Sequence, residues 1–200
     1  MELFLTILLF AFSSTITPGP NNVMIMTSGL NYGVKNSLPH LFGICLGFPT
    51  MVIIVGLGFG VLFEQYPFIH QIIKVLGIAY LLYLSWLIAN ANPNTLEGKN
   101  SKPFTFIQAF LFQWVNPKAW VMATGAIAAF TSVSGSILFE VSLISFAFLA
   151  VAFPCVGTWL YFGAGMKQVL QQEKYQRRFN VTMALLLVLS IVPVLLEYNS

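Results

Sequence analysis

The polar groups that could do chemistry in this sequence are gathered at two interruptions of apolar segments. One is the run Thr17-Pro18-Gly19-Pro20-Asn21-Asn22, and the other is the shorter run Asn116-Pro117-Lys118. Proline removes a backbone donor and clashes with the preceding helical turn, so each run should break or bend a helix. A broken helix exposes backbone N–H and carbonyl groups, to which these runs add amide groups and one ammonium group. The chemistry they indicate is the binding of a small charged or polar ligand.

A catalytic or metal site is not indicated elsewhere in the chain. There is no Asp, and the Glu residues fall at the ends of apolar runs or between them: Glu2, Glu64, Glu97, Glu140, Glu173 and Glu197. His40 and His70 also lie near the ends of such runs, and we interpret both as interfacial side chains. Hydrolysis in an apolar setting needs a Ser/His pair, two Asp residues or a His/Glu metal set. We therefore expect neither an enzyme nor a bound metal or cofactor.

The elements that position these residues are predicted to be membrane-spanning helices. Of the 200 residues, 58% are apolar and 8% are charged, and the mean hydropathy is +0.83. Soluble globular proteins carry about 25% charged residues, and a chain of this length leaves about 30% of its unfolded surface exposed after folding. So much apolar surface cannot face water. Lipid is therefore the expected solvent, and disordered, fibrous and nucleic-acid-binding classes are excluded.

Six apolar runs are long enough to cross a bilayer, which takes about 20 residues of helix. They cover residues 3–28, 38–63, 68–89, 104–130, 137–163 and 179–196. The first begins without a positively charged leader or a small-residue cleavage site, so we expect a retained span rather than a signal peptide. No connection is long or polar enough for a soluble domain. The prediction is an all-α polytopic membrane protein with one transmembrane domain, residues 1–200.

The distribution of Lys and Arg predicts how these spans are oriented. Cytoplasmic loops are enriched in basic residues, and the connections after spans one, three and five carry Lys35, Lys99, Lys102, Lys167, Lys174, Arg177 and Arg178. The opposite side carries only Lys74. Both termini should therefore be periplasmic. We interpret the basic cluster at residues 174–178 as a topology signal that contacts anionic lipid headgroups, not nucleic acid.

The two interruptions occupy matching positions in the two halves of the chain. When Pro20 is aligned with Pro117, spans two and five also correspond, since each carries a Phe-Pro pair, at Phe48-Pro49 and Phe153-Pro154. Three spans per half is an odd number, so the second half must be inverted relative to the first. One proline break in a membrane helix is often only a kink. Two breaks at corresponding positions of inverted repeats point to the central binding site of a transporter.

Small residues in spans two and five have a structural interpretation. The pairs Gly43-xxx-Gly47 and Gly56-xxx-Gly60 let helix backbones approach closely, and we assign them to packing. Cys45 and Cys155 lie in apolar runs and are expected to be buried core residues. An alternative function remains open, in which these two thiols form a membrane conduit for reducing equivalents, although they lie away from the two interruptions.

The Pro-Gly-Pro motif at residues 18–20, the Asn-Pro-Lys motif at residues 116–118, the length and the span count together resemble the LysE/RhtB family of amino-acid exporters. The resemblance runs along essentially the whole chain. The stretch at residues 38–47 is similar to the branch that exports homoserine, threonine, cysteine or O-acetylserine. The resemblance implies a secondary transporter in the bacterial inner membrane that is driven by proton antiport, and it leaves a homodimer open.

We interpret the nine residues of the two interruptions as the substrate site. An amino-acid zwitterion needs partners for a carboxylate and for an ammonium group. The helix that begins at Pro20, where the missing N–H costs nothing, offers backbone N–H groups and a positive dipole end to the carboxylate. The carbonyls of Thr17 and Pro18, with the amide oxygens of Asn21 and Asn22, offer acceptors to the ammonium group.

Lys118 is the only charged residue near the middle of a predicted span, where burial costs about 2.5–3.5 kcal/mol. We interpret it as a second carboxylate anchor or as a group that exchanges a proton, and Asn116 adds an amide beside it. The alternative is a lysine that reaches the cytoplasmic interface, with residues 104–115 lying along the membrane surface. Because no buried acid is available to neutralise a cationic side chain, small neutral amino acids are the expected substrates. The sequence does not identify the residue that couples transport to protons.

Overall fold

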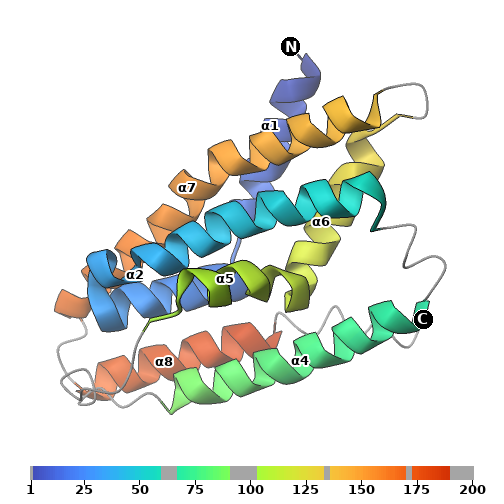
Figure 1. Ribbon diagram of the computed structural model, residues 1–200. Helices are drawn as coiled ribbons and strands as arrows, with labels where there is room; N and C mark the ends of the chain where they lie inside the picture. Colours follow the sequence, from blue (N-terminus) through green and yellow to red (C-terminus); the bar gives the residue numbers. More distant parts are fainter. Residues whose placement is uncertain (1, 60–66, 91–102, 133–135, 170–172, 190–200) are drawn as a thin grey trace.

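Helices make up nearly all of the described structure. The computed structural model describes residues 2–59, 67–90, 103–132, 136–169 and 173–189, and no strand occurs among them. The predicted all-α class is therefore confirmed for these residues. In chain order the elements are α1 (Glu2–Ile16), α2 (Pro20–Ile54), the π-helical turn η1 (Val55–Phe59), α4 (Pro67–Ala89), α5 (Phe106–Phe112), the 3₁₀ turn η3 (Gln113–Val115), α6 (Pro117–Phe130), α7 (Ile137–Val169) and α8 (Glu173–Leu189) (Figure 1).

Two of the predicted connections are largely helical. The expected loop at residues 31–36 belongs to α2, and the chain turns instead at Gly33, whose φ of 76° is accessible to glycine because it lacks a Cβ atom. The polar stretch at residues 167–178 is divided largely between the end of α7 and the start of α8. Lys, Gln and Glu favour helix nearly as well as Leu does. Polar residues therefore prolong these helices beyond the apolar runs that hydropathy detects.

Helices α2 and α7 form the central pair, and two glycines bring their backbones together. A Cβ atom on Gly29 of α2 would overlap the carbonyl oxygen of Leu160 in α7, and a Cβ atom on Gly163 of α7 would overlap the carbonyl oxygen of Met26. Small residues at membrane helix contacts permit this close approach. The first segment of α2, before Gly33, is thereby fixed on the second half of α7.

The predicted packing role of the glycines is confirmed for Gly43 and Gly47 in the second segment of α2 and for Gly56 in η1. Gly43 and Gly47 lie against α5, and Gly56 lies against Val141 of α7. A Cβ atom on any of the three would come closer than 3.0 Å to a neighbouring atom. Gly60 lies outside the described residues.

The helix ends are sorted into two groups at opposite ends of the bundle (Figure 1). The turn at Gly33, the C-terminal ends of α4 and α7 and the N-terminal ends of α5 and α8 lie at one end, on the left of the view. The N-terminus, η1, the C-terminal end of α6 and the N-terminal ends of α4 and α7 lie toward the other. Between these ends α1 packs on α7, α5 packs on α2, and α4 packs on α8. The basic residues Lys35, Lys174, Arg177 and Arg178 lie next to the first group of helix ends.

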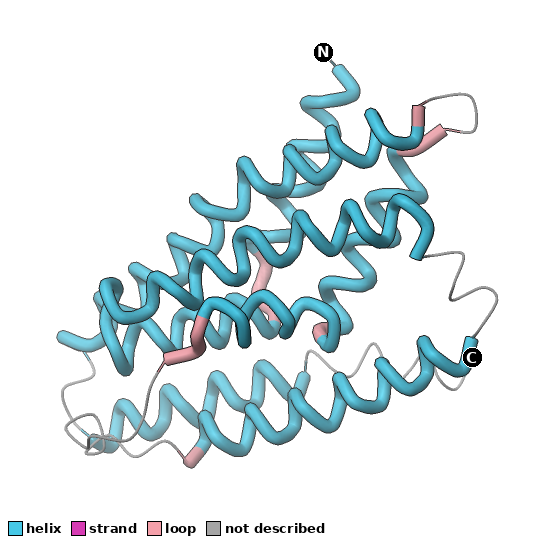
Figure 2. The backbone as a smooth tube through the Cα atoms, in the orientation of Figure 1, coloured by secondary structure: helices cyan, strands magenta, loops and turns pink. Residues whose placement is uncertain are grey.

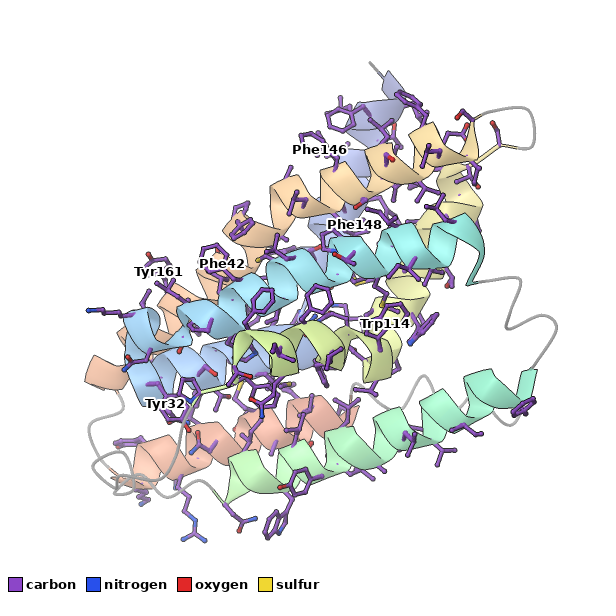
Figure 3. The ribbon with its side chains drawn as sticks, viewed as in Figure 1. Tyr32, Phe42, Trp114, Phe146, Phe148 and Tyr161 are labelled. Atoms are coloured by element: carbon purple, nitrogen blue, oxygen red, sulfur yellow. The ribbon has the colours of Figure 1, made fainter. Side chains whose placement is uncertain are left out.

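Large apolar side chains cover the outside of the bundle. Phe42, Phe146 and Tyr161 project from the outer surface of α2 and α7, where they are 44%, 58% and 66% exposed (Figure 3). Within the described residues, α2 with η1 and the larger part of α7 are the two helices that are long and apolar enough to cross a membrane by length and composition. An apolar surface this extensive is a liability in water. It suits a protein surrounded by lipid.

Candidate functional site

The two predicted helix breaks are present. Asn116 of the second break is buried, whereas Thr17 and Pro18 of the first are exposed. Helix α1 ends at Ile16 and α2 begins at Pro20, while η3 ends at Val115 and α6 begins at Pro117. Figure 2 shows both breaks as short loop segments among the helices. Each proline starts its helix, as predicted for Pro20, at a position where the missing N–H would have no intrahelical partner.

Lys118 joins the two breaks. Its Nζ atom donates to the Thr17 carbonyl oxygen at 2.9 Å, to the Thr17 Oγ1 atom at 2.8 Å and to the Pro18 carbonyl oxygen at 3.2 Å. Gly19 leaves room for this side chain, because a Cβ atom there would lie 2.6 Å from Cδ of Lys118. The ammonium group therefore binds carbonyls at the end of α1.

Asn22 satisfies the carbonyls that α1 leaves at its C-terminal end. Its side chain is 3% exposed, and its Nδ2 atom donates to the carbonyl oxygens of Thr15 at 2.7 Å and Thr17 at 2.8 Å. The last carbonyls of a helix have no intrahelical donor, so a buried helix end needs partners of this kind. Asn22 and Lys118 together hold the first break in its observed shape.

Gln113 is a site residue that the sequence analysis missed. Its Nε2 atom donates to Asn21 Oδ1 at 3.1 Å, and Asn21 Nδ2 donates to Gln113 Oε1 at 2.8 Å, so the two amides bind each other reciprocally. Gln113 is completely buried and also donates to the carbonyl oxygen of Ala109. The sequence feature that could have identified Gln113 is a polar amide within an apolar run, three residues before Asn116. This pair is a second connection between the two breaks.

Asn116 caps the N-terminus of α6. Its side chain is 2% exposed, and its Oδ1 atom accepts a hydrogen bond from the Lys118 backbone N–H at 3.1 Å. Asparagine is among the preferred residues at this position. The side chain of Asn116 therefore fixes the direction in which Lys118 leaves the helix.

Two indole groups bind carbonyls next to the breaks. Trp159 of α7 donates through Nε1 to the carbonyl oxygen of Ile16, the last residue of α1, at 3.0 Å. Trp120 of α6 donates through Nε1 to the carbonyl oxygen of Trp114, just before the second break, at 2.8 Å. Each break therefore has a tryptophan partner on its preceding segment.

A cavity of about 40 Å³ lies where the two breaks meet. Its polar wall consists of Ser14, Thr15, Gly19, Asn21, Asn22, Asn116 and Lys118, and its apolar wall consists of Ile44, Phe48, Ala119, Met122, Ala152 and Val156. Of the nine predicted site residues, the polar wall therefore includes five, while Thr17, Pro18, Pro20 and Pro117 shape the breaks. A water molecule needs at least about 10–15 Å³ of such space. The cavity therefore has room for a few waters.

The cavity lies between helix ends of opposite partial charge, which suits a ligand that carries one positive and one negative group. The N-terminal ends of α2 and α6 carry partial positive charge, and their N-cap residues, Gly19 and Asn116, both line the cavity. The C-terminal end of α1, with partial negative charge, lies beside them. Thr15 Oγ1 in the cavity wall is buried and has no hydrogen-bond partner among the described residues. An unpaired buried hydroxyl is costly unless water or a ligand binds it.

The interpretation of His40 as an interfacial side chain was wrong. His40 is 1% exposed, its Nδ1 atom lies 2.9 Å from Ser28 Oγ, and its ring stacks on Phe104 with the ring centroids 5.2 Å apart. The error follows from the expected loop at residues 31–36, because α2 resumes after Gly33 and carries His40 to its inner face. The side chain of His70 lies outside the described part of the structure.

Cys45 and Cys155 are completely buried free thiols, as expected for core residues. Neither lines the cavity, although the neighbouring residues Ile44 and Val156 do. A thiol that exchanges electrons with a partner has to be accessible to it. No group of three or more His, Cys, Asp or Glu residues with metal-binding geometry occurs in the described ranges.

Comparison with known proteins gives a consistent family. The family model described as LysE type translocator matches residues 12–197. The cysteine/O-acetylserine efflux protein of Escherichia coli strain K12 is 28% identical over 186 residues, which is 90% of this chain and 90% of that protein. The protein of the same name from Shigella flexneri serotype 5b (strain 8401) is 30% identical over the same length and the same shares. No solved structure matches the chain.

Proposed function

The chain belongs to the LysE type translocator family, and on this premise we propose that it exports small neutral amino acids or their derivatives from the bacterial cytoplasm by proton antiport. As a translocator it is a transporter and not an enzyme. The names of the relatives, cysteine/O-acetylserine efflux protein, support a small neutral substrate. The length of the match, 90% of each chain, supports the assignment for the whole protein.

The observation that carries this proposal is the cavity between the two breaks, with Lys118 bound to the end of α1. A zwitterion needs a positive region and a negative region close together in a site with few waters. The N-terminal ends of α2 and α6 with the Lys118 ammonium supply the first, and they suit a carboxylate. The end of α1 and the unpaired hydroxyl of Thr15 supply acceptors for the substrate's ammonium group.

Lys118 already binds the Thr17 and Pro18 carbonyls in this structure. The substrate's ammonium group therefore competes with Lys118 for these acceptors or shares them with it. In the first case Lys118 swings toward the substrate carboxylate and becomes its charge partner. Substrate binding then loosens the contact that holds the two breaks together, which couples binding to movement of the helices.

The apolar wall of the cavity limits the substrate side chain. Ala152 and Val156 of α7 face Ile44 and Phe48 of α2 across the space left for it. No acidic side chain lines this wall. A cationic side chain such as that of lysine would lose its hydration without gaining a partner, which is strongly unfavourable. The wall therefore suits short neutral side chains.

We also infer that six spans form two inverted repeats within one transmembrane domain. The contacts of the described helices support this arrangement, because α5 packs on α2 as α1 packs on α7. Pro49 lies inside α2 and Pro154 lies inside α7, and these two helices form the central pair. The grouping of helix ends supports cytoplasmic connections near Gly33 and at the start of α8. Both termini are then periplasmic.

The test is transport by the purified full-length chain in proteoliposomes. Labelled cysteine, O-acetylserine, serine, threonine and homoserine are compared with lysine and arginine in counterflow, against protein-free liposomes. The neutral substrates should exchange and the cationic ones should not. Preferential exchange of lysine would contradict the substrate class, and exchange of no amino acid would contradict amino-acid export itself.

A further inference from the structure

His40 is a buried ionisable side chain that the proposed substrate site does not use. It is 1% exposed, bonded to Ser28 through Nδ1 and stacked on Phe104. Ionisable groups inside a membrane protein are costly to keep, and they commonly mark proton pathways. The cavity lining contains no imidazole or carboxylate. A transporter that exchanges protons therefore needs a titratable group elsewhere or the amine of Lys118.

Ser37, one helical turn before His40, adds a second polar group at this place. Its side chain is completely buried, and its hydroxyl has no hydrogen-bond partner among the described residues. A buried hydroxyl left without a partner costs free energy, so such a group points to a water or a mobile proton that binds it. Ser28, Ser37 and His40 thus form a small polar cluster within an apolar helix interface.

Charged groups do not neutralise this cluster in the described structure. Helix α5 contains no ionisable residue, and Glu140 of α7 is bonded to Ser132 at the far end of that helix. The other ionisable groups on the elements around it are the exposed Lys35, Tyr83, Tyr161, Lys174, Tyr175, Arg177 and Arg178, the half-buried Tyr32, and the buried thiols Cys45 and Cys155. No carboxylate of a described side chain faces the ring. A charged imidazolium would therefore lack a counterion among the described side chains.

We propose that His40, paired with Ser28, binds and releases the proton that is exchanged for the amino acid. This inference rests on the proposed function. In the neutral ring one nitrogen accepts and the other carries hydrogen, so the Ser28 hydroxyl donates to Nδ1 when the ring proton is on Nε2. A proton taken from water on the periplasmic side adds to Nδ1, so that the ring no longer accepts from Ser28 and becomes a donor at both nitrogens. The same proton later passes to cytoplasmic water, which restores the neutral ring and the bond to Ser28.

The position of the pair explains how proton binding reaches the substrate site. Ser28 lies on the same helical segment as Asn22, six residues and about 9 Å farther along the axis. His40 lies beyond Gly33, where the backbone leaves helical geometry. The pair therefore bridges two rigid segments across a turn that can act as a hinge. Protonation favours a conformation in which the segments separate and water reaches the ring, because the charge is better solvated there.

The test compares counterflow with gradient-driven efflux in proteoliposomes that hold the full-length chain. We take one proton to be exchanged for each amino acid. A pH about one unit lower on the side opposite the amino acid then changes the equilibrium ratio of amino-acid concentrations across the membrane about tenfold. The unmodified protein should show this response. His40→Asn keeps a hydrogen-bond acceptor for Ser28 but carries no proton. Its counterflow should persist, and its gradient response should disappear.

Phe104→Leu is the matched control, because it removes the ring stacked on His40 and leaves the titratable pair intact. It should keep the gradient response. A response that survives in His40→Asn, or that is lost equally in Phe104→Leu, overturns the proposal. The proposal is also overturned if the unmodified protein catalyses counterflow but does not respond to the pH gradient. Amino-acid export itself then stands. Absence of counterflow with every amino acid instead overturns the proposed function.

Ser28→Ala keeps the test decisive if His40→Asn fails to insert. This variant retains the imidazole and removes its hydrogen-bond partner. The pH midpoint of efflux should move by about half a unit or more, since one hydrogen bond to the ring is lost. An unmoved midpoint in correctly inserted protein overturns the proposal.

Discussion

The ammonium group of Lys118 lies 2.8 Å from the hydroxyl of Thr17, across 101 residues of sequence. This contact connects the break that opens α6 to the break that opens α2. Asn21 and Gln113 connect the same two places through their amides. The two breaks are thus joined by two polar links, each of which has one end in either half of the chain.

The first prediction concerns the shared site. Asn22→Ala and Lys118→Ala should each lower the efflux rate about tenfold or more, because each removes a donor that binds carbonyls at the first break. In the double variant the losses should not add, since both residues act on one site. The measurement is the initial efflux rate per inserted protein in proteoliposomes. Low expression with normal transport by the inserted fraction would show that these residues only shape the fold.

Lys118→Arg separates two roles for the charge. The guanidinium keeps the positive charge but is broad, planar and permanently protonated. If Lys118 is a simple anchor for the carboxylate, the Arg variant should retain transport. If the compact ammonium must fit beside Gly19, where even a Cβ atom would crowd Lys118, transport should be lost. We expect loss, as measured by counterflow of cysteine.

The second prediction concerns the size of the substrate. Ala152→Val narrows the apolar wall of the cavity and should disfavour O-acetylserine relative to serine by about tenfold, which is the range expected for small changes in an apolar pocket. Ala150→Val is the control, because Ala150 is exposed on the same helix and the substitution has the same effect on helix propensity. Competition between the two amino acids in counterflow gives the ratio. Equal ratios in both variants would remove Ala152 from the substrate pocket.

The third prediction concerns the contact of α2 with α7. Gly163→Ala should lower the free energy of unfolding by about 1–3 kcal/mol, because the added Cβ overlaps the carbonyl oxygen of Met26. Gly165→Ala, two residues along the same helix, meets nothing within 4 Å and should be neutral or slightly stabilising. Thermal unfolding in detergent, followed for both variants, checks the difference. Equal midpoints would mean that the two helices do not pack this closely.

The fourth prediction concerns topology. The helix ends near Gly33 and at the start of α8 lie at one end of the bundle, where the basic residues are also found. Reporter fusions at the C-terminus should therefore read as periplasmic, and fusions in the connection around Lys99 as cytoplasmic. A cytoplasmic C-terminus would reduce the number of spans to five.

The breaks were predictable from the sequence because their causes are local. Proline lacks the N–H that would continue a preceding helix, and at Pro20 and Pro117 the neighbouring Gly19 and Asn116 adopt extended backbone and complete the break. The amide of Gln113 gave no such signal, since its importance depends on Asn21, which is 92 residues away. A pairing at that separation is decided by how the helices pack, and periodicity within one helix does not report it.

The burial of His40 was also not predictable from the sequence. Its position near the end of an apolar run suggested the membrane interface, and the suggestion depended on a loop at residues 31–36. A single residue, Gly33, reverses the chain direction instead, so that α2 resumes at once and His40 meets Ser28. Hydropathy records how apolar a segment is and not where a glycine adopts positive φ.

The fluorescence of Trp159 reports on the first helix break. Its hydrogen bond to the carbonyl oxygen of Ile16 fixes the ring at the end of α1, and Trp120 is held in the same way beside the second break. Any movement that opens either break must change the partner or the polarity around an indole, and the emission of tryptophan depends on both. Both indoles therefore lie beside the breaks that the proposed mechanism moves. A spectrum recorded during substrate addition reports their opening without any attached dye.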